Sequence, residues 1–310
     1  MKLTEQTVIV GGFPNPIGGV TTFLSRLVKA YPQFVVFVLD LYADDTKRIP
    51  ANYKGIYKLI PNKIKALIYL LSLQTRYKKE TFFFNFSSGN SLIYFLLLPK
   101  LGRNWTLMLH HGHLTSRLPH FILKYILNKF NKIYTLNNRQ TDFYKSICPN
   151  LPLITETSYV PATLIDISAA EKIPLIIAKK KNFKIVIGSG FPRKLYQHHL
   201  LIDLIEKNSN TFLFLFLYGE GELKQKLTNL NHPRIHVFTN QNEDMLNYYL
   251  SQANIYVRPT LEDSFGIVCA DAINFGITAI ASNVCTRYAG VKTFNLNHKE
   301  ELYELFKQSL

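Results

Sequence analysis

The stretch from Phe183 to Leu217, FKIVIGSGFPRKLYQHHLLIDLIEKNSNTFLFLFL, decides the fold. It opens with an apolar run typical of a buried strand, continues with helical spacing through HHLLIDLIEKN, and ends in a second apolar run. Two such strands joined by a helix indicate a parallel sheet, because parallel neighbours need a crossover connection.

The same alternation extends through the chain on both sides of this stretch. Strands are expected at residues 7–13, 33–42, 81–86, 105–113, 132–137, 234–239, 253–260 and 277–283. Helices are expected at residues 20–32, 62–79, 91–101, 119–130, 138–147, 220–230, 242–252, 266–276 and 298–309. Residues 150–182 interrupt the pattern and are expected to be irregular. The sequence therefore predicts an α/β protein with two Rossmann-like doubly wound domains, 1–160 and 161–310, facing across a cleft where ligands bind.

Composition limits the class of protein. The chain has 310 residues, of which 47% are hydrophobic, so it can bury a core. Three scattered cysteines show no metal or disulfide spacing, which suits a reducing compartment. The N-terminus does not read as a signal peptide, and the apolar runs are far shorter than the roughly 20 residues that span a bilayer. We expect a cytoplasmic protein, soluble or peripheral on the inner face of the cytoplasmic membrane.

Positive charge is concentrated in the first half. Residues 1–150 hold 20 Lys and Arg against 6 Asp and Glu, a balance of +14, whereas residues 151–310 hold 16 against 15. A basic half can simply aid solubility, or it can face an anionic partner such as membrane lipid, an acidic substrate or nucleic acid. A nucleic-acid partner is not expected, since no recognised binding module is present.

Several cofactor motifs are absent from the sequence. No G-x-G-x-x-G follows the first strand, and neither a P-loop nor a G-x-S-x-G elbow occurs. No D-x-D pair is found, and the histidine pairs lack partners with zinc-ligand spacing. We expect neither a cofactor nor a bound metal.

Three glycine-bearing turns lie between expected strands and helices. Gly18 and Gly19 precede the first helix, where backbone amides can approach a bulky anion. Arg193 and Lys194 follow the strand that opens the second half, and both side chains can bind phosphate oxygens. Phe265, Gly266 and Ile267 form the third turn, at the start of a helix. Together these residues are the predicted site for a diphosphate.

Acids flank the third turn in RPTLEDSFGIVCADAINFG, Arg258–Gly276. Asp271 follows the turn by about 1.4 helical turns, among apolar neighbours, where an unpartnered acid would be costly. Beside a phosphate site, a carboxylate is better suited to accept hydrogen bonds from a sugar diol than to bind phosphate. We therefore expect Asp271 to hold a ribose and Asp263 to hold a second sugar beyond the phosphates.

These motifs resemble those of the retaining, metal-independent glycosyltransferases of family 4, group 1, which have the GT-B fold. That family places two glutamates around a G-F-G turn, and here the positions read Asp263, Ser264-Phe265-Gly266 and Asp271. YGEGELKQKL, PNPIGGVTTFL and LHHGH resemble further landmarks of the family. The likeness covers nearly the whole chain, and it is loose in residues 40–100.

The resemblance implies roles for individual residues. His111 corresponds to a histidine that faces the transferred sugar, and with Asp263 it is the expected catalytic residue. Glu262 and Ser264 would join Asp263 in binding that sugar. Phe238 and Thr239 would flank the nucleotide base.

The resemblance also implies transfer of a hexose-type sugar from a nucleoside diphosphate sugar to a glycan or lipid-linked acceptor with retention, with the acceptor bound by the basic half. Abundant Lys, Asn, Ile, Phe and Tyr hint at a bacterial genome and at cell-surface polysaccharide synthesis, as in capsule or lipopolysaccharide. Residues 54–79, rich in lysine and apolar side chains, either lie on an anionic membrane or form an ordinary helix packed on the sheet. Alternatives are a nucleotide-sugar epimerase of the same fold and a non-catalytic subunit that binds sugar nucleotides.

Overall fold

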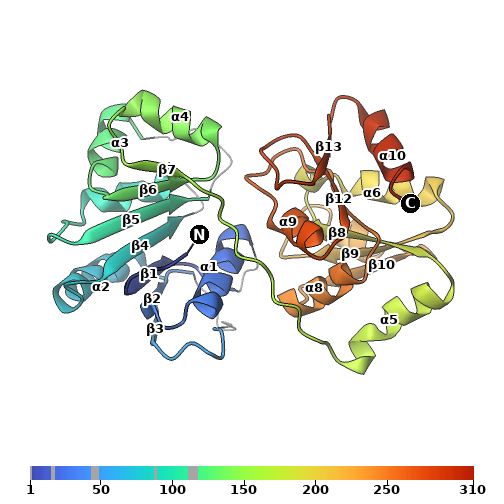
Figure 1. Ribbon diagram of the computed structural model, residues 1–310, viewed down its shortest axis with the longest axis horizontal. Helices are drawn as coiled ribbons and strands as arrows, with labels where there is room; N and C mark the ends of the chain where they lie inside the picture. Colours follow the sequence, from blue (N-terminus) through green and yellow to red (C-terminus); the bar gives the residue numbers. More distant parts are fainter. Residues whose placement is uncertain (1, 15–17, 43–48, 87–88, 111–117) are drawn as a thin grey trace. The chain divides into compact units, whose positions relative to one another are not determined.

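The chain forms two compact α/β units, Met1–Val160 and Pro161–Leu310, in a computed structural model (Figure 1). Each unit is built on its own parallel sheet, which confirms the α/β class with two Rossmann-like domains. The structure describes residues 2–14, 18–42, 49–86, 89–110 and 118–310.

The first unit contains a seven-stranded sheet in the order β3-β2-β1-β4-β5-β6-β7. Successive neighbours pair in parallel register, for example Ile9 with Phe83. Its elements are β1 Thr7–Gly11, α1 Gly19–Ala30, β2 Val35–Asp40, β3 Ile56–Leu59, α2 Lys63–Arg76, β4 Thr81–Phe86, the 3-10 helix η1 Gly89–Leu96, β5 Asn104–Leu109, α3 His120–Leu127, β6 Lys132–Thr135, α4 Asn138–Ile147 and β7 Leu153–Thr155.

Helices cover both faces of this sheet because its central strands are apolar on both sides. On one face, Val8 and Val10 of β1 pack in a core with residues of α2, η1 and α3, such as Leu70, Phe95 and Leu123. Figure 1 shows α1 on the opposite side of the strands from α2 and α3. The strand order reverses between β1 and β4, so ligands are expected at the carboxyl ends of these two strands.

The second unit contains a six-stranded sheet in the order β10-β9-β8-β11-β12-β13. Helix α10 stays with this unit, since its Leu302 and Phe306 are buried in the core with residues of α6 and β11. The elements are α5 Ala169–Lys180, β8 Lys184–Gly190, the 3-10 helix η2 Lys194–Tyr196, α6 His198–Lys207, β9 Thr211–Leu217, α7 Lys224–Thr228, β10 Ile235–Thr239, α8 Glu243–Ser251, β11 Ile255–Arg258, α9 Ile267–Asn274, β12 Thr278–Ser282, β13 Lys292–Phe294 and α10 Lys299–Lys307.

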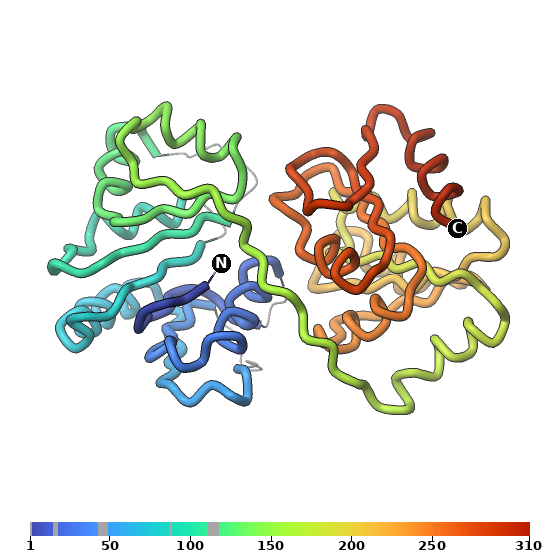
Figure 2. The backbone as a smooth tube through the Cα atoms, viewed as in Figure 1, coloured from blue at the N-terminus to red at the C-terminus, as the bar shows by residue number. Residues whose placement is uncertain are grey.

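The expectation that residues 150–182 are irregular is wrong in two parts, because Leu153–Thr155 form strand β7 and a helix follows it. After the extended segment that follows β7 (Figure 2), Ala169–Lys180 form helix α5 despite Pro174 in its interior. Ser168 and Glu171 form a capping box at its start, which satisfies amides that have no partner within the helix. Lys179 and Lys180 lie in the last turn, where positive charge favours the helix dipole.

Among the described residues, the helices are too short or too polar to cross a membrane.

Candidate functional site

The candidate site of the second unit lies at the carboxyl ends of β8 and β11. These strands are neighbours in the sheet, yet β8 connects onward to β9 on one side and β11 to β12 on the other. The loops that leave the two strands therefore diverge at the sheet edge, which is the position where ligands bind in open α/β sheets. Two of the three predicted turns, those at Arg193 and Gly266, begin from these strand ends.

The loops after β8, β9 and β11 are tied together by main-chain hydrogen bonds. The amide of Leu261, after β11, donates to the carbonyl of Leu195 at 2.8 Å, and the amide of Leu223, after β9, donates to Pro192 at 2.9 Å. A Cβ on Gly221 would lie 2.3 Å from the Pro192 oxygen, so glycine is required for this approach. The three loops thus form one connected platform.

A buried histidine supports the turn after β8. The Nε2 atom of His198 lies 2.8 Å from the carbonyl oxygen of Phe191, and its ring stacks on Tyr196 with 9° between the planes. Burial lowers the pKa of His198 to about 4, which keeps the imidazole neutral at pH 7. A neutral imidazole bonded in this way donates from Nε2 and holds the Phe191 carbonyl in place.

The two predicted cations lie exposed on this turn. Arg193 places its guanidinium 5.4 Å from the centre of the Phe191 ring, and its Nε donates to the Glu220 carbonyl at 3.3 Å. The backbone amide of Lys194 donates to a carboxylate oxygen of Glu222 at 2.7 Å. This hydrogen bond uses the backbone amide of Lys194 and not its side-chain ammonium group.

Asp263 is the centre of a buried ion cluster. Its Oδ2 lies 2.5 Å from Nε of Arg258 and 2.6 Å from Nη1 of Arg287, and its Oδ1 accepts the Ser264 amide at 3.0 Å. Burial alone would raise the pKa of Asp263, but the two guanidinium groups outweigh it and hold the pKa well below its ordinary value. Both carboxylate oxygens contact the protein itself, so the expected sugar contact of Asp263 stays a prediction.

Gly266 is required by this cluster. Its φ of 80° lies in the left-handed region, which strains residues with a Cβ. A Cβ there would also lie 2.6 Å from Nη1 of Arg287 and 3.2 Å from Oδ2 of Asp263. The backbone reverses at Gly266 and α9 begins at Ile267, with Phe265 buried against Tyr288.

The other residues of this region that are expected to bind sugars differ in their exposure to solvent. Glu262 is exposed on the turn, and Ser264 is half-buried beside it. Asp271 lies in α9 and is only 1% exposed, among buried Cys269, Ala270 and Ala272. The ribose contact expected of Asp271 also stays a prediction.

The two residues expected to flank the base occupy β10, which is separated from β8 by β9. The ring of Phe238 packs against Phe214, Phe216 and Tyr249 and is 8% exposed. Thr239 ends the strand and is exposed. Of the pair, Thr239 therefore offers the accessible side chain.

The first unit holds the other predicted residues. Gly18 precedes α1 in extended conformation, and its amide donates to the Thr21 hydroxyl at 2.9 Å. A Cβ built on Gly19 meets nothing within 4 Å, so space is open above this backbone. His111 lies outside the described residues. The neighbouring His110 is buried, and its Nε2 lies 3.1 Å from Oδ1 of Asn85.

Sequence reasoning missed Arg258, Arg287 and His198. Arg258 stands five residues before Asp263, and a buried acid next to an arginine was a usable signal. Arg287 comes from the segment after β12, and its contact arises only because β12 pairs with β11. His198 showed no signal beyond its place at the start of a helix.

The comparisons with known proteins agree with this architecture. Residues 169–293 match the family model for glycosyl transferases group 1, a range that includes both turns of the second unit. No curated protein matches the chain.

Solved structures resemble the whole chain. Anabaena Alr3699/HepE in complex with UDP-glucose has a TM-score of 0.73 at 12% identity, over 98% of this chain and 89% of that chain. Sucrose-phosphate synthase from Thermosynechococcus elongatus has a TM-score of 0.67 at 13% identity, over 98% and 89% of the two chains. An α,α-trehalose-phosphate synthase (UDP-forming) from Burkholderia xenovorans has a TM-score of 0.69 at 9% identity, over 98% and 92%. These likenesses establish the GT-B fold.

Proposed function

We propose that this chain, in which residues 169–293 match the group 1 glycosyl transferases, moves a hexose-type sugar from a nucleoside diphosphate sugar to a glycan or lipid-linked acceptor. Transfer proceeds with retention of the anomeric configuration and without a metal. The observation that carries the proposal is the platform formed by the loops after β8, β9 and β11. It joins the cationic turn to the glycine turn at the position in the sheet where nucleotides bind.

The proposed donor site combines cationic groups, which bind the diphosphate, with acidic groups, which bind the sugars. Arg193 and Lys194 bind the diphosphate, assisted by the amides at the start of α9, and the same ligand is assigned to Gly18 and Gly19. A helix start contributes only about 0.3–1 kcal/mol when exposed, so the cations carry most of this interaction. Asp271 binds the ribose, Glu262 and Ser264 bind the transferred sugar, and Thr239 flanks the base.

Asp263 acts in this proposal mainly by positioning. Its ion pairs with Arg258 and Arg287 hold the turn that presents Ser264 and Gly266 to the donor. The carboxylate is ionised near neutral pH, because its pKa is held well below the ordinary value. A contact with a sugar hydroxyl adds to this role by using a remaining lone pair.

The chemistry exchanges one bond at the anomeric carbon for another. The bond from that carbon to the diphosphate breaks, a bond to the acceptor hydroxyl forms on the same face, and the hydroxyl proton passes to the departing diphosphate. Arg193 and Lys194 stabilise the charge that develops on the diphosphate, which is the usual way such sites lower a barrier. His111 donates a hydrogen bond to the transferred sugar. No protein nucleophile is assigned.

The basic first unit supports the proposed acceptor and setting. A surplus of positive charge in residues 1–150 supports an acceptor carried by an anionic membrane, as in bacterial capsule or lipopolysaccharide synthesis. Helix α2 exposes Ile64 and Ile68 beside its lysines, a surface suited to the boundary between head groups and acyl chains. We expect the protein to sediment with anionic vesicles at low salt, and absence of binding would count against this setting.

Incubation with labelled UDP-, GDP- and TDP-sugars, with and without bacterial membrane lipid extract, tests the activity. Label transferred to an extractable product supports the transferase. A product formed equally well without any acceptor would instead indicate an epimerase. Binding of a sugar nucleotide without turnover in either condition would indicate a non-catalytic subunit.

A further inference from the structure

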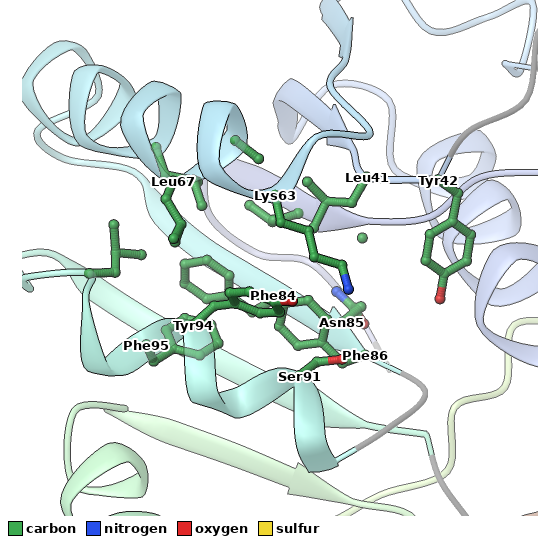
Figure 3. A pocket seen from close by; sticks show the side chains of 15 residues that line it. Leu41, Tyr42, Lys63, Leu67, Phe84, Asn85, Phe86, Ser91, Tyr94 and Phe95 are labelled. Atoms are coloured by element: carbon green, nitrogen blue, oxygen red, sulfur yellow. The ribbon is translucent and has the colours of Figure 1, made fainter.

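A pocket in the first unit lies at the carboxyl end of β1 and β4, where the strand order of that sheet reverses (Figure 3). It has a volume of about 190 Å³. Its walls come from four regions: the ends of β1 and β4, the residues after β2, the inner face of α2, and η1. All of these elements belong to one unit, so the pocket is a property of that unit alone.

The pocket has an apolar body. Leu67 and Leu70 of α2, Phe84 of β4 and Phe95 of η1 line it. Cavities of about 150 Å³ lined by Leu, Ile and Phe bind benzene, so this volume suits an apolar group of about seven or eight carbon atoms. A free sugar ring would leave its hydroxyls without partners against these walls, at considerable cost.

The side chains of Lys63 and Asn85 lie at one end of the apolar part of the pocket. Figure 3 shows Lys63 pointing toward Asn85, with Ser91 nearby. The ammonium of Lys63 lies 5.1 Å from the centre of the Tyr94 ring, and Asn85 is held by His110, whose Nε2 lies 3.1 Å from Oδ1. No acid is among the described residues that line the pocket.

The position of Lys63 is electrostatically unfavourable for the helix. Lys63 is the first residue of α2, Lys65 is the third, and the first turn contains no acid. The N-terminus of a helix carries a partial positive charge, so lysines there lower helix stability. An arrangement that concentrates positive charge at a helix start attracts an anion from outside.

We propose that this pocket binds the hydrocarbon group next to the phosphate of the acceptor, so that the acceptor is a phosphate ester with an apolar chain. The proposal rests on the proposed transferase activity, and it names the acceptor class. The phosphate contacts Lys63 and Asn85, the first seven or eight carbons fill the space between α2 and η1, and a longer chain continues along the exposed Ile64 and Ile68.

Binding of heptyl phosphate to the full chain, measured by calorimetry without any donor, tests this site directly. We expect saturable binding with a negative heat-capacity change, the signature of apolar burial. Heptanol and inorganic phosphate should each bind far more weakly, because each lacks one half of the interaction. Equal binding of inorganic phosphate would show that only charge is recognised and would overturn the proposal.

Three variants locate the site. Lys63→Glu should weaken heptyl phosphate binding at least about tenfold, because a charge-assisted contact is replaced by repulsion. Leu67→Trp should abolish it by filling the pocket. Lys65→Glu is the matched control, since Lys65 lies on the same exposed helix start but outside the lining of this pocket. Equal weakening by the Lys63 and Lys65 variants would refute the site.

UDP binding separates failure of this inference from failure of the proposed function. UDP should bind all variants as it binds the wild type, because the donor residues of the second unit are unchanged. If UDP binds and heptyl phosphate does not, the pocket proposal is wrong while the transferase proposal stands. If heptyl phosphate binds at this pocket and no sugar nucleotide binds at all, the alkyl phosphate site is upheld and the transferase proposal fails.

Discussion

Replacement of Asp263 by asparagine should destabilise the second unit strongly. The carboxylate contacts two guanidinium groups at 2.5 and 2.6 Å, and the three side chains are 9%, 13% and 3% exposed. Asparagine keeps the shape but leaves two buried positive charges without an anion. Breaking a buried ion pair in this way typically costs about 3–5 kcal/mol. For a unit of this size, that loss corresponds to a fall in melting temperature of roughly 10 °C.

Two probes assign the effect to the correct unit. Trp105, the single tryptophan of the chain, is fully buried in β5, so its fluorescence reports unfolding of the first unit. Far-UV circular dichroism reports both units. We expect Asp263→Asn to lower the transition that has no tryptophan signal and to leave the Trp105 transition in place.

A matched exposed pair provides the control. Asp166 contacts Lys172 at 2.7 Å in the same unit, but Asp166 is 73% exposed and solvent screens the pair. Asp166→Asn should therefore change the melting temperature little. Adding Arg287→Met to Asp263→Asn should recover part of the loss, because one unpaired buried charge is removed. Equal, small effects of Asp263→Asn and Asp166→Asn would refute the argument.

The stability lost in Asp263→Asn should depend on pH in a defined direction. The pKa of Asp263 in the folded protein lies below its ordinary value of 3.8, so its contribution is present above that value and is lost as the pH falls toward the folded pKa. The difference in stability between the wild type and Asp263→Asn should therefore shrink below about pH 4. A constant difference through this range would contradict an ionised carboxylate.

Three further predictions follow from the second unit. Gly266→Ala should lower its stability by roughly 1–3 kcal/mol, measured by thermal unfolding, since φ is 80° and Arg287 occupies the space of the methyl group. Arg193→Gln should weaken UDP-sugar binding about tenfold in calorimetry without lowering the melting temperature, and an unchanged affinity would exclude its phosphate role. Cys269 and Cys285 should react slowly with iodoacetamide at pH 8, because burial raises the pKa of each thiol to about 11, and alkylation at the rate of the unfolded chain would contradict this.

Long apolar strands and regularly spaced helices could be predicted from the sequence. Strand β9 reads TFLFLFL and is buried along nearly its whole length, so one local pattern identifies it. Strand β3 has only four residues and alternates between exposed and half-buried, and β7 has three, so no apolar run marked either strand. Helix α5 was missed because Pro174 and a run of lysines masked a capping box that operates over four residues.

The candidate site could be predicted in its turns and less well in its contacts. Gly266 and Arg193 were recognisable because glycine and arginine have distinct local chemistry next to a strand end. The partners of Asp263 were not, because Arg287 lies 24 residues away and reaches it through strand pairing. Burial of Phe238 likewise depends on α8, whose Tyr249 packs against its ring.

The hydrogen bonds that tie the loops after β8, β9 and β11 have a consequence for how this protein can diverge. The amides of Leu261 and Leu223 and the carbonyls of Leu195 and Pro192 are main-chain groups, present whatever side chain is attached. Mutations at the exposed positions of these loops can therefore accumulate without loosening their framework. New ligand preferences can therefore arise by single substitutions at these exposed positions.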